Sequence, residues 1–168
     1  MLKIEHLKKH HDRKIFDCGS KKLNDFLHKH ARQHAERDIS RTFVLTDDAN
    51  PKKILGYYTL TVCEVIPSDT PDPRLKRYPH PMPASKLARL SVCSNSQRNG
   101  IGGKLLLNAM ERSVAISENA GLIGMFVDAK DDDAARYYKQ YGFISTENDH
   151  LILYLPMETI RQAFKAKP

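Results

Sequence analysis

The segment Gln97-Arg98-Asn99-Gly100-Ile101-Gly102-Gly103 is a glycine-rich turn between two parts of the chain with different periodicity. The residues before it, Ser85–Cys93, have the composition of a strand. The residues after it, from about Gly102 to Glu118, place apolar side chains at helical spacing: Leu105, Leu106, Ala109, Met110, Val114 and Ala115. A strand that turns through glycines into a helix directs backbone N–H groups into one concavity, where the helix dipole favours an anion. The turn therefore predicts a phosphate-binding site, to which Arg98 and Lys104 can add charge.

Two familiar phosphate-binding patterns do not fit this turn. The Walker pattern requires Ser or Thr after Gly-Lys, but Gly103-Lys104 is followed by Leu105. The dinucleotide pattern requires a third glycine where Leu105 stands. The glycines alone leave open the alternative that the loop only reverses the chain.

The segment after the helix completes a crossover unit. We expect Gly121 to end the helix in the left-handed conformation. Leu122–Val127 is almost entirely apolar, which is typical of a parallel strand covered on both faces. Ser85–Val127 is therefore predicted to be a strand–helix–strand unit with two parallel strands.

Further elements are predicted on both sides of this unit. On the N-terminal side we expect a strand at Met1–His6, a helix capped by Ser20 that runs to about Arg37, and a hairpin of Arg41–Thr46 with Ile54–Ile66. On the C-terminal side we expect a helix at Asp131–Gln140, strands at Phe143–Ile144 and Leu151–Leu155, and a helix from Pro156 to Ala166. Pro67–Pro83 holds six of the nine prolines and is predicted to be a functional loop. The fold class is α/β, with a mixed central sheet and flanking helices.

Length and composition are those of an ordinary globular chain. The 168 residues predict one domain spanning 1–168, and 40% hydrophobic with 28% charged residues argues against disorder. The longest uncharged apolar run, Ile54–Cys63, is too short for a membrane helix, and the N-terminus lacks the apolar core of a signal peptide. Three widely spaced cysteines predict neither disulfides nor a metal site, so we expect a cytoplasmic protein that does not bind membranes.

Two motifs together resemble the GCN5-related N-acetyltransferases (GNAT family). Gln97-x-x-Gly100-x-Gly102 is similar to the family's Gln/Arg-x-x-Gly-x-Gly/Ala signature. Ala134-Ala135-Arg136-Tyr137-Tyr138-Lys139-Gln140-Tyr141-Gly142-Phe143 resembles its Ala-x-x-Phe-Tyr-x-x-x-Gly-Phe segment. The resemblance implies the GNAT fold, in which the parallel strand pair of the mixed sheet is splayed.

A narrower resemblance covers most of the chain and points to the acetyltransferase toxins of toxin–antitoxin pairs. It rests on Phe16–Gly19, Leu23–Leu27, Gly56–Leu60, Leu87–Val92, Val127–Ala129 and Leu155–Met157. Such toxins acetylate the α-amine of aminoacyl-tRNA, block translation and are encoded beside a ribbon-helix-helix antitoxin; they usually form dimers. Two positions depart from the pattern, because Cys93 stands where Asp is expected and Arg98 stands where glycine is common.

The resemblance implies roles for individual residues. Acetyl-CoA is expected to bind through its pyrophosphate at Gln97, Arg98, Asn99, Gly100, Ile101, Gly102, Gly103 and Lys104. A backbone N–H of the strand Leu90, Ser91 and Val92 is expected to stabilise the oxyanion. Tyr138 is the expected general acid for the leaving thiolate, while Tyr137 and Tyr141 are expected to pack inward.

The general base is less defined. The α-amine of an aminoacyl ester is far less basic than lysine, so a dedicated base is less necessary. Glu64 and His80 are candidates for a water-mediated role, whereas His10 and His11 are expected at the surface of a polar loop. Direct transfer is favoured over a covalent intermediate on Cys93.

Basic residues outside the turn predict a second anionic partner. The formal net charge is +7, from 27 Lys and Arg against 20 Asp and Glu. Lys8–Arg37 is strongly basic, and Arg74–Arg89 contains five cations without an acid: Arg74, Lys76, Arg77, Lys86 and Arg89. We expect these five residues to contact tRNA, although a solvated basic face is the alternative.

Two function classes compete with aminoacyl-tRNA acetylation. One is a GNAT enzyme that acetylates a small amine, such as a polyamine or antibiotic, or a protein N-terminus and has no toxin role. A polyamine site would need a carboxylate cluster, which the proline-rich loop lacks. The other is a non-catalytic module that only binds coenzyme A, against which the intact Tyr138 and the glycines argue.

Overall fold

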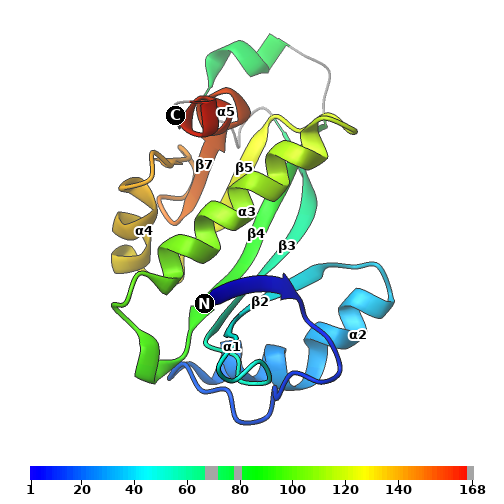
Figure 1. Ribbon diagram of the computed structural model, residues 1–168. Helices are drawn as coiled ribbons and strands as arrows, with labels where there is room; N and C mark the ends of the chain where they lie inside the picture. The colour runs from blue at the N-terminus through cyan, green and yellow to red at the C-terminus, as the bar shows by residue number, and fades with distance from the viewer. Residues whose placement is uncertain (67–71, 78–80, 166–168) are drawn as a thin grey trace. The chain divides into compact units, whose positions relative to one another are not determined.

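A computed structural model describes residues 1–66, 72–77 and 81–165. The chain forms two compact units that each draw on distant segments (Figure 1). The first unit comprises Met1–Thr61 and Ala88–Ala109, and the second comprises Val62–Leu87 and Met110–Pro168. The strands follow the order β1-β2-β3-β4-β5-β7-β6 in a mixed sheet, which confirms the predicted α/β class. That the chain is a single domain stays a prediction.

The N-terminal half of the first unit is an antiparallel meander. β1 (Leu2–His6) pairs with β2 (Arg41–Asp47), and β2 pairs with β3 (Gly56–Val65). In β2 every residue from Thr42 to Thr46 is buried, because these strands carry the apolar side chains of this unit's core. The predicted N-terminal strand and hairpin are confirmed.

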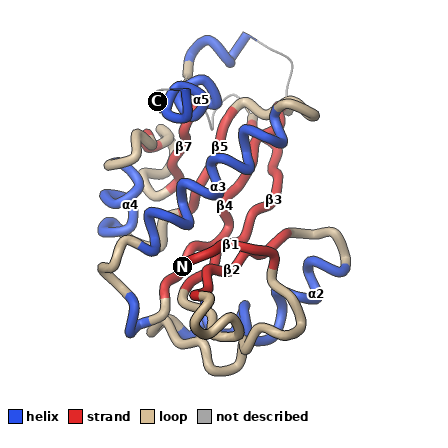
Figure 2. Tube along the Cα trace, in the orientation of Figure 1, coloured by secondary structure: helices blue, strands red, loops and turns tan. Residues whose placement is uncertain are grey.

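The helical segment after Ser20, which ends in the helix labelled α2 in Figure 2, contains an irregular turn that the sequence did not predict. Ser20 caps α1 (Lys21–Asp25), since its hydroxyl accepts a hydrogen bond from the Leu23 amide. A π-helical turn, η1 (Phe26–His30), follows, and α2 (Ala31–Glu36) completes the segment. The Ala31 amide donates a hydrogen bond to the carbonyl of Phe26, five residues back instead of the four of an α-helix. The hydrogen-bonded turn therefore contains one more residue than an α-helical turn.

The crossover unit is confirmed. β4 (Met82–Val92) leads through a short 3₁₀ turn, η4 (Ser94–Ser96), to the glycines and then to α3 (Ile101–Ser117). β5 (Gly124–Asp128) pairs in parallel with β4. Their register covers only Ser85–Leu87 with Met125–Val127, so Ala88–Val92 extends beyond the paired part, as a splayed pair requires.

The C-terminal part belongs to the second unit. α4 (Asp132–Lys139) is capped by Asp131, whose carboxylate accepts a hydrogen bond from the Ala134 amide at 2.8 Å. β7 (Ile152–Pro156) pairs with β5 and with β6 (Ile144–Ser145), and α5 (Met157–Lys165) packs on β5 and β7. Phe126 and Tyr154 form part of a core cluster here with Val65 and Ala84.

Three predicted details are wrong. Met82 and Pro83 already belong to β4, and Pro73–Arg77 forms a 3₁₀ turn, η3, so Pro67–Pro83 is not one loop; its residues 67–71 and 78–80 lie outside the described part. Pro156 ends β7 instead of opening the last helix, because it still lies in register with Gly124 of β5. Gly121 is not left-handed, since α3 ends at Ser117 and the chain turns through hydrogen bonds of Asn119 and Ala120 to Ile116.

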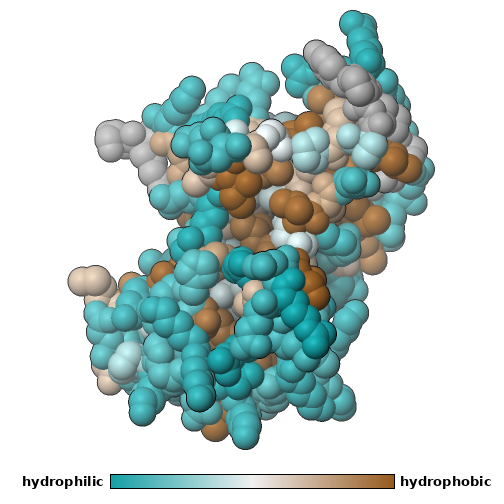
Figure 3. Space-filling view, turned by 90° about the vertical axis from the view of Figure 1, so that its right-hand side faces the viewer, coloured by the Kyte–Doolittle hydropathy of each residue, from teal (hydrophilic) through white to brown (hydrophobic). Residues whose placement is uncertain are grey.

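Polar residues dominate the face that Figure 3 shows, with apolar side chains between them. In the described part of the chain, no helix is both long enough and apolar enough to cross a bilayer. Cys18, Cys63 and Cys93 are all free thiols.

Candidate active site

The glycine turn has the backbone geometry that an anion site requires. Arg98 and Gly100 have positive φ angles of 68° and 78°, and α3 begins at the next residue, Ile101. The first amides of a helix have no acceptor within the helix, so those of Ile101, Gly102 and Gly103 remain for a ligand. The positive φ of Arg98 also explains why glycine is common at this position in the family.

Gln97 anchors the turn. Its side-chain amide donates to the Val92 carbonyl at 3.1 Å and to the Cys18 carbonyl at 3.2 Å. These bonds tie the end of β4 and the loop at Cys18-Gly19 to the start of the turn. The sequence had assigned Gln97 to cofactor binding, and the structure adds that this side chain positions the turn.

The charges around the turn suit a pyrophosphate. Segment 97–104 contains two cations, Arg98 and Lys104, and no acid. Both side chains are exposed, as are Asn99 and Gly100, so the concavity is accessible. Leu90, Ser91 and Val92 lie in the same compact unit, on the part of β4 that extends past its pairing with β5.

Tyr138 belongs to the second unit, on α4. It is the most buried of the three neighbouring tyrosines at 7% exposure, whereas Tyr137 and Tyr141 are half-buried. Its ring makes edge contacts with Tyr137 and Phe143, with centroids 5.5 and 5.7 Å away. Burial raises the pKa of Tyr138 well above its ordinary value, so its hydroxyl keeps its proton at neutral pH.

The cations that are predicted to contact tRNA differ in whether an acid of the protein pairs with them. Arg74 is paired with Asp72 through two nitrogens at 3.1 and 2.9 Å, and Lys86 is paired with Asp128 at 2.9 Å. Lys76 and Arg77 are exposed at the end of η3. The acid of Arg74 is a near neighbour in the sequence, just outside the segment Arg74–Arg89, whereas the tertiary structure supplies the acid of Lys86.

Arg89 lies in the first unit, in different surroundings. It is half-buried on β4, and its guanidinium carbon lies 3.6 Å from the centre of the Phe26 ring. Lys21, Lys22 and His30 lie around the same hollow, although the sequence did not single them out. The excess of cations in Lys8–Arg37 was the signal for them, and Phe26 was assigned to the core because it fits the apolar stripe.

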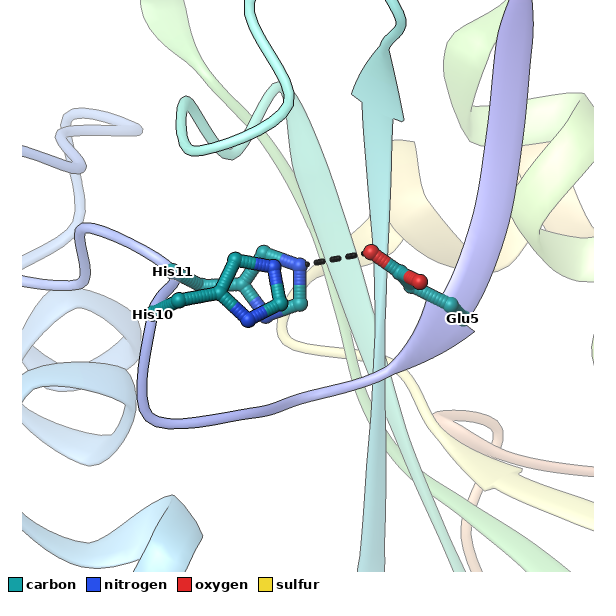
Figure 4. Close-up of side chains that lie close together, drawn as sticks. All are labelled: Glu5, His10 and His11. Atoms are coloured by element: carbon teal, nitrogen blue, oxygen red, sulfur yellow. Dashed lines mark hydrogen bonds and ion pairs between the residues drawn. The ribbon is translucent and has the colours of Figure 1, made fainter.

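Glu5, His10 and His11 lie close together and have the atom types of a metal site (Figure 4). The prediction that His11 is a surface residue is wrong, because it is 3% exposed beneath the loop after β1. Its Nδ1 accepts the Lys8 amide at 2.9 Å, so its Nε2 carries the proton and donates to Glu5 at 2.8 Å. With both ring nitrogens engaged, His11 holds β1 against the loop instead of offering a ligand atom.

The structure describes one of the two candidate bases and the candidate nucleophile Cys93. Glu64 is exposed on β3, whereas His80 lies outside the described residues. Cys93 is 8% exposed in a core cluster with Phe16, Phe26 and Tyr57, which favours direct transfer over a covalent intermediate on its thiol.

Comparison with known proteins defines the class. Residues 15–160 match the model of the acetyltransferase (GNAT) domain. The strand, the glycine turn and the helix that carry the family's signature follow in this order within the matched residues. The chain belongs to the GNAT family of acetyltransferases.

Relatives narrow the comparison within the family. A tRNA-acetylating toxin of Mycobacterium tuberculosis is 32% identical over 146 residues, which cover 87% of this chain and 86% of the relative. The solved structure of AtaT complexed with acetyl-methionyl-tRNAfMet has a TM-score of 0.89 and 30% identity, covering 98% of this chain and 99% of AtaT. A tyrosine-to-phenylalanine mutant of AtaT, bound to the C-terminus of the antitoxin AtaR and acetyl-CoA, has a TM-score of 0.83 and 29% identity over 98% and 99%.

Proposed function

We propose that this protein transfers an acetyl group from acetyl-CoA to the α-amine of aminoacyl-tRNA and thereby acts as a translation-blocking toxin. The observation that carries the proposal is similarity along almost the whole chain to a tRNA-acetylating toxin and to AtaT in complex with an acetylated aminoacyl-tRNA. The exposed glycine turn at the start of α3, with two cations and no acid, supports the choice of acetyl donor.

Bound acetyl-CoA would supply the acetyl group as a thioester. The amides at the start of α3, together with Arg98 and Lys104, would bind its pyrophosphate. A backbone N–H in Leu90–Val92 would donate to the carbonyl oxygen as negative charge develops there. Holding the thioester beside the amine lowers the entropy cost of the encounter.

Tyr138 would act as the general acid. The amine nitrogen forms a bond to the carbonyl carbon, the carbon–sulfur bond breaks, and the leaving sulfur takes the proton of Tyr138 Oη. The ammonium proton of the new amide goes to solvent, from which Tyr138 is reprotonated. A tyrosine hydroxyl is protonated at neutral pH even at its ordinary pKa of about 10, so its proton is available to the leaving sulfur.

A dedicated base is less necessary for this substrate. An α-amine has a pKa of about 7.7–8.0 in unstructured peptides, and a fraction of it is neutral at physiological pH. Water would accept its proton, with Glu64 as the described candidate for relaying it.

The decisive experiment incubates the purified protein with acetyl-CoA and a pool of charged tRNAs, then analyses the 3′-terminal amino acids by mass spectrometry. We expect N-acetylated aminoacyl esters to accumulate. Acetylation of spermidine or of peptide N-termini in parallel reactions, with untouched charged tRNA, would overturn the proposal in favour of the small-amine or protein-modifying alternative.

The partners follow from the same proposal. We propose that a ribbon-helix-helix antitoxin binds this protein, that the protein is a homodimer, and that it works in the cytoplasm, where charged tRNA is found. The solved structure of the AtaT mutant bound to the C-terminus of the antitoxin AtaR supports the first point. Light scattering would report the mass of the purified protein, and co-expression with an adjacent reading frame should relieve growth arrest.

A further inference from the structure

Cys18 and Cys93 are two free thiols that none of the steps above uses. They lie 75 positions apart in the sequence (93 minus 18), and that spacing alone predicts no disulfide. In the folded chain both belong to the first unit, where Cys93 is part of the core cluster that contains Phe26 and Tyr57. Cys18 packs against this same cluster, so both side chains lie at one apolar core.

Hydrogen bonds on both sides of the two cysteines place them opposite each other. The Ser94 amide donates to the Asp17 carbonyl at 2.9 Å. This bond joins the peptide unit after Cys93 to the one before Cys18. The side-chain nitrogen of Gln97 donates to the carbonyls of the two other peptide units, the one after Cys18 and the one before Cys93. This crossed order is that of two residues opposed on antiparallel chains.

A pair opposed in this way has the separation that a disulfide requires. Opposed residues on antiparallel chains have Cα atoms about 4.5–5.5 Å apart, and disulfides span Cα separations of about 4.4–6.8 Å. Hydrogen bonds also hold the backbone at both positions. The Cys93 amide donates to the Leu55 carbonyl at 2.8 Å, and the Cys18 amide donates to Asn24 Oδ1 at 3.0 Å. Formation of the bond therefore requires rotation of side chains and little movement of the backbone.

The two thiols differ in their access to solvent. Cys18 is half-buried, whereas Cys93 is only 8% exposed. The Cys18 sulfur donates two weak hydrogen bonds, to Asn24 Oδ1 at 3.2 Å and to the Ser20 carbonyl at 3.7 Å. Rotation about the Cα–Cβ bond can exchange these bonds for contact with Cys93. An oxidant therefore reaches Cys18 first, and Cys93 is placed to react with the product.

We propose that Cys18 and Cys93 form a site of reversible oxidation, at which a peroxide converts the two thiols into a disulfide. The Cys18 sulfur attacks hydrogen peroxide, a water is released, and the thiol becomes a sulfenic acid. The Cys93 sulfur then attacks that sulfur, so that the S–S bond forms and the S–O bond breaks. The hydroxyl leaves with the Cys93 proton as a second water. The two thiols are oxidised by two electrons in total, and one peroxide is reduced to two waters.

The position of the site suggests what the crosslink does. Cys93 stands where the family pattern has Asp, so the pair of thiols is a departure from that pattern. The site adjoins the predicted acetyl-CoA turn, because the Cys18 carbonyl is one of the two acceptors of Gln97. A crosslink here would hold the loop before α1 to the end of β4 in the arrangement that the Gln97 bonds already fix. The oxidised protein should keep the turn assembled and resist unfolding, since a crosslink across a long segment restricts the unfolded chain.

The test treats the full-length protein with one equivalent of hydrogen peroxide in native buffer, blocks the remaining thiols by alkylation and measures the intact mass. We expect the chain to lose the mass of two hydrogen atoms and to keep Cys63 as its alkylated thiol. Peptide mapping without reductant should find Cys18 linked to Cys93, and dithiothreitol should restore both thiols. Linkage to Cys63, or oxidation of Cys18 beyond the sulfenic acid without a crosslink, would overturn the proposal.

Three variants separate the roles of the cysteines. Cys63→Ala, in the second unit, is the matched control and should form the crosslink as wild type does. Cys93→Ala keeps an apolar side chain in the core, and dimedone should capture the sulfenic acid that then persists at Cys18. Cys18→Ala should yield neither the crosslink nor the dimedone adduct. A crosslink that forms in wild type only when urea is present would assign the bond to the unfolded chain and contradict the proposal.

Stability and coenzyme binding give a second readout. The urea midpoint of oxidised wild type should exceed that of the reduced protein, and peroxide should not raise the midpoint of Cys93→Ala. Calorimetry should find equal acetyl-CoA affinity in the two redox forms of wild type, because Gln97 keeps both acceptors. A lower midpoint or a lost affinity on oxidation would contradict the opposed geometry that the proposal requires.

The inference does not depend on the proposed function, and the outcomes keep the two apart. A protein that acetylates charged tRNA but forms no crosslink under peroxide contradicts the oxidation site alone. A protein that forms the crosslink but leaves charged tRNA untouched contradicts the proposed function alone.

Discussion

At the scale of single residues, the clearest contrast is between Tyr138 and its neighbours. Three tyrosines lie within five positions, and they differ in burial: Tyr138 is buried and contacts the rings of Tyr137 and Phe143, whereas Tyr137 and Tyr141 are half-buried. Enclosure disfavours the phenolate and keeps the proton on the hydroxyl. The resemblance assigned the acid to this position, and the structure adds that Tyr138 is the most buried of the three.

Removing the Tyr138 hydroxyl should abolish most of the turnover. We expect Tyr138→Phe to lower kcat by about 100-fold or more, because a positioned general acid contributes about 10²–10⁴-fold. Calorimetry should find acetyl-CoA affinity unchanged, since the ring remains and the turn Gln97–Lys104 is intact. Tyr141→Phe, which removes a hydroxyl from the same segment, is the control and should retain activity; equal kcat values for the two variants would assign the proton transfer elsewhere.

His11 predicts a pH dependence of stability. Burial lowers the pKa of His11 below its ordinary value near 6.5, and the hydrogen bond with Glu5 opposes this only in part. The unfolded chain therefore binds a proton on His11 more readily than the folded chain. Folding stability from this residue is complete above about pH 6.5 and is lost as the pH falls toward the folded-state pKa.

Thermal melts between pH 5 and pH 8 check this prediction, with the pH range chosen around the ordinary histidine pKa of about 6.5. Wild type should lose melting temperature on the acid side more steeply than His11→Gln, which keeps a donor for Glu5 but cannot titrate. The same slope in both proteins would mean that other groups, such as the exposed histidines, cause the dependence.

At the scale of elements, close packing between β3 and the crossover unit depends on Gly56. A Cβ atom at this position would lie 2.9 Å from Leu105 Cδ1 and 3.0 Å from the Ser91 carbonyl oxygen. The first contact involves α3 and the second involves the backbone of β4, which cannot rotate away. Gly56 thus lets three elements of the first unit approach one another beside the predicted site.

We expect Gly56→Ala to destabilise the protein by about 1–3 kcal/mol, the usual cost of overpacking a core. Urea denaturation measures the change. Gly121→Ala is the matched control, because a Cβ there meets nothing within 4 Å and the φ angle is not positive; it should be neutral or slightly stabilising. Equal midpoints for the two variants would show that β4 and α3 can shift to accept the methyl group.

The first helical segment shows where periodicity stops being informative. Leu23, Phe26, Leu27 and Ala31 fit one helix in sequence, and the Ser20 cap is confirmed. The π turn inside it depends on a shift of hydrogen bonding to the carbonyl five residues back, as at Ala31, and no residue type specifies that shift. That shift helps to present Phe26 beneath Arg89, a contact between residues 63 positions apart (89 minus 26) that only folding creates.

At the scale of the whole molecule, the net charge of +7 comes from cations of two kinds, those paired with an acid and those that are not. Arg74 and Lys86 pair with Asp72 and Asp128, so they contribute little to the attraction of an anionic partner. Lys76 and Arg77 are exposed, and the described residues place no carboxylate within ion-pair distance of either.

Charge reversal at this pair should affect RNA and not the coenzyme. We expect Lys76→Glu with Arg77→Glu to weaken tRNA binding and to reduce the slope of log affinity against log salt by about one for each lost phosphate contact. Acetyl-CoA affinity should stay the same. The control is Lys130→Glu with Lys165→Glu, which changes two exposed lysines of the same unit and gives the same net charge. An identical loss of tRNA binding in both double variants would show that the effect comes from overall charge alone.

Local sequence determined the order of elements, the Ser20 and Asp131 caps, the glycine turn before α3 and the family to which the chain belongs. These features depend on neighbours in the chain, where glycine, capping residues and periodicity act directly. Tertiary structure alone decided that Asp128 neutralises Lys86, that His11 is buried, that β4 begins at Met82, and that Arg89 stacks on Phe26. Those outcomes depend on contacts between distant segments, and such contacts leave no periodic or compositional signal in a single sequence.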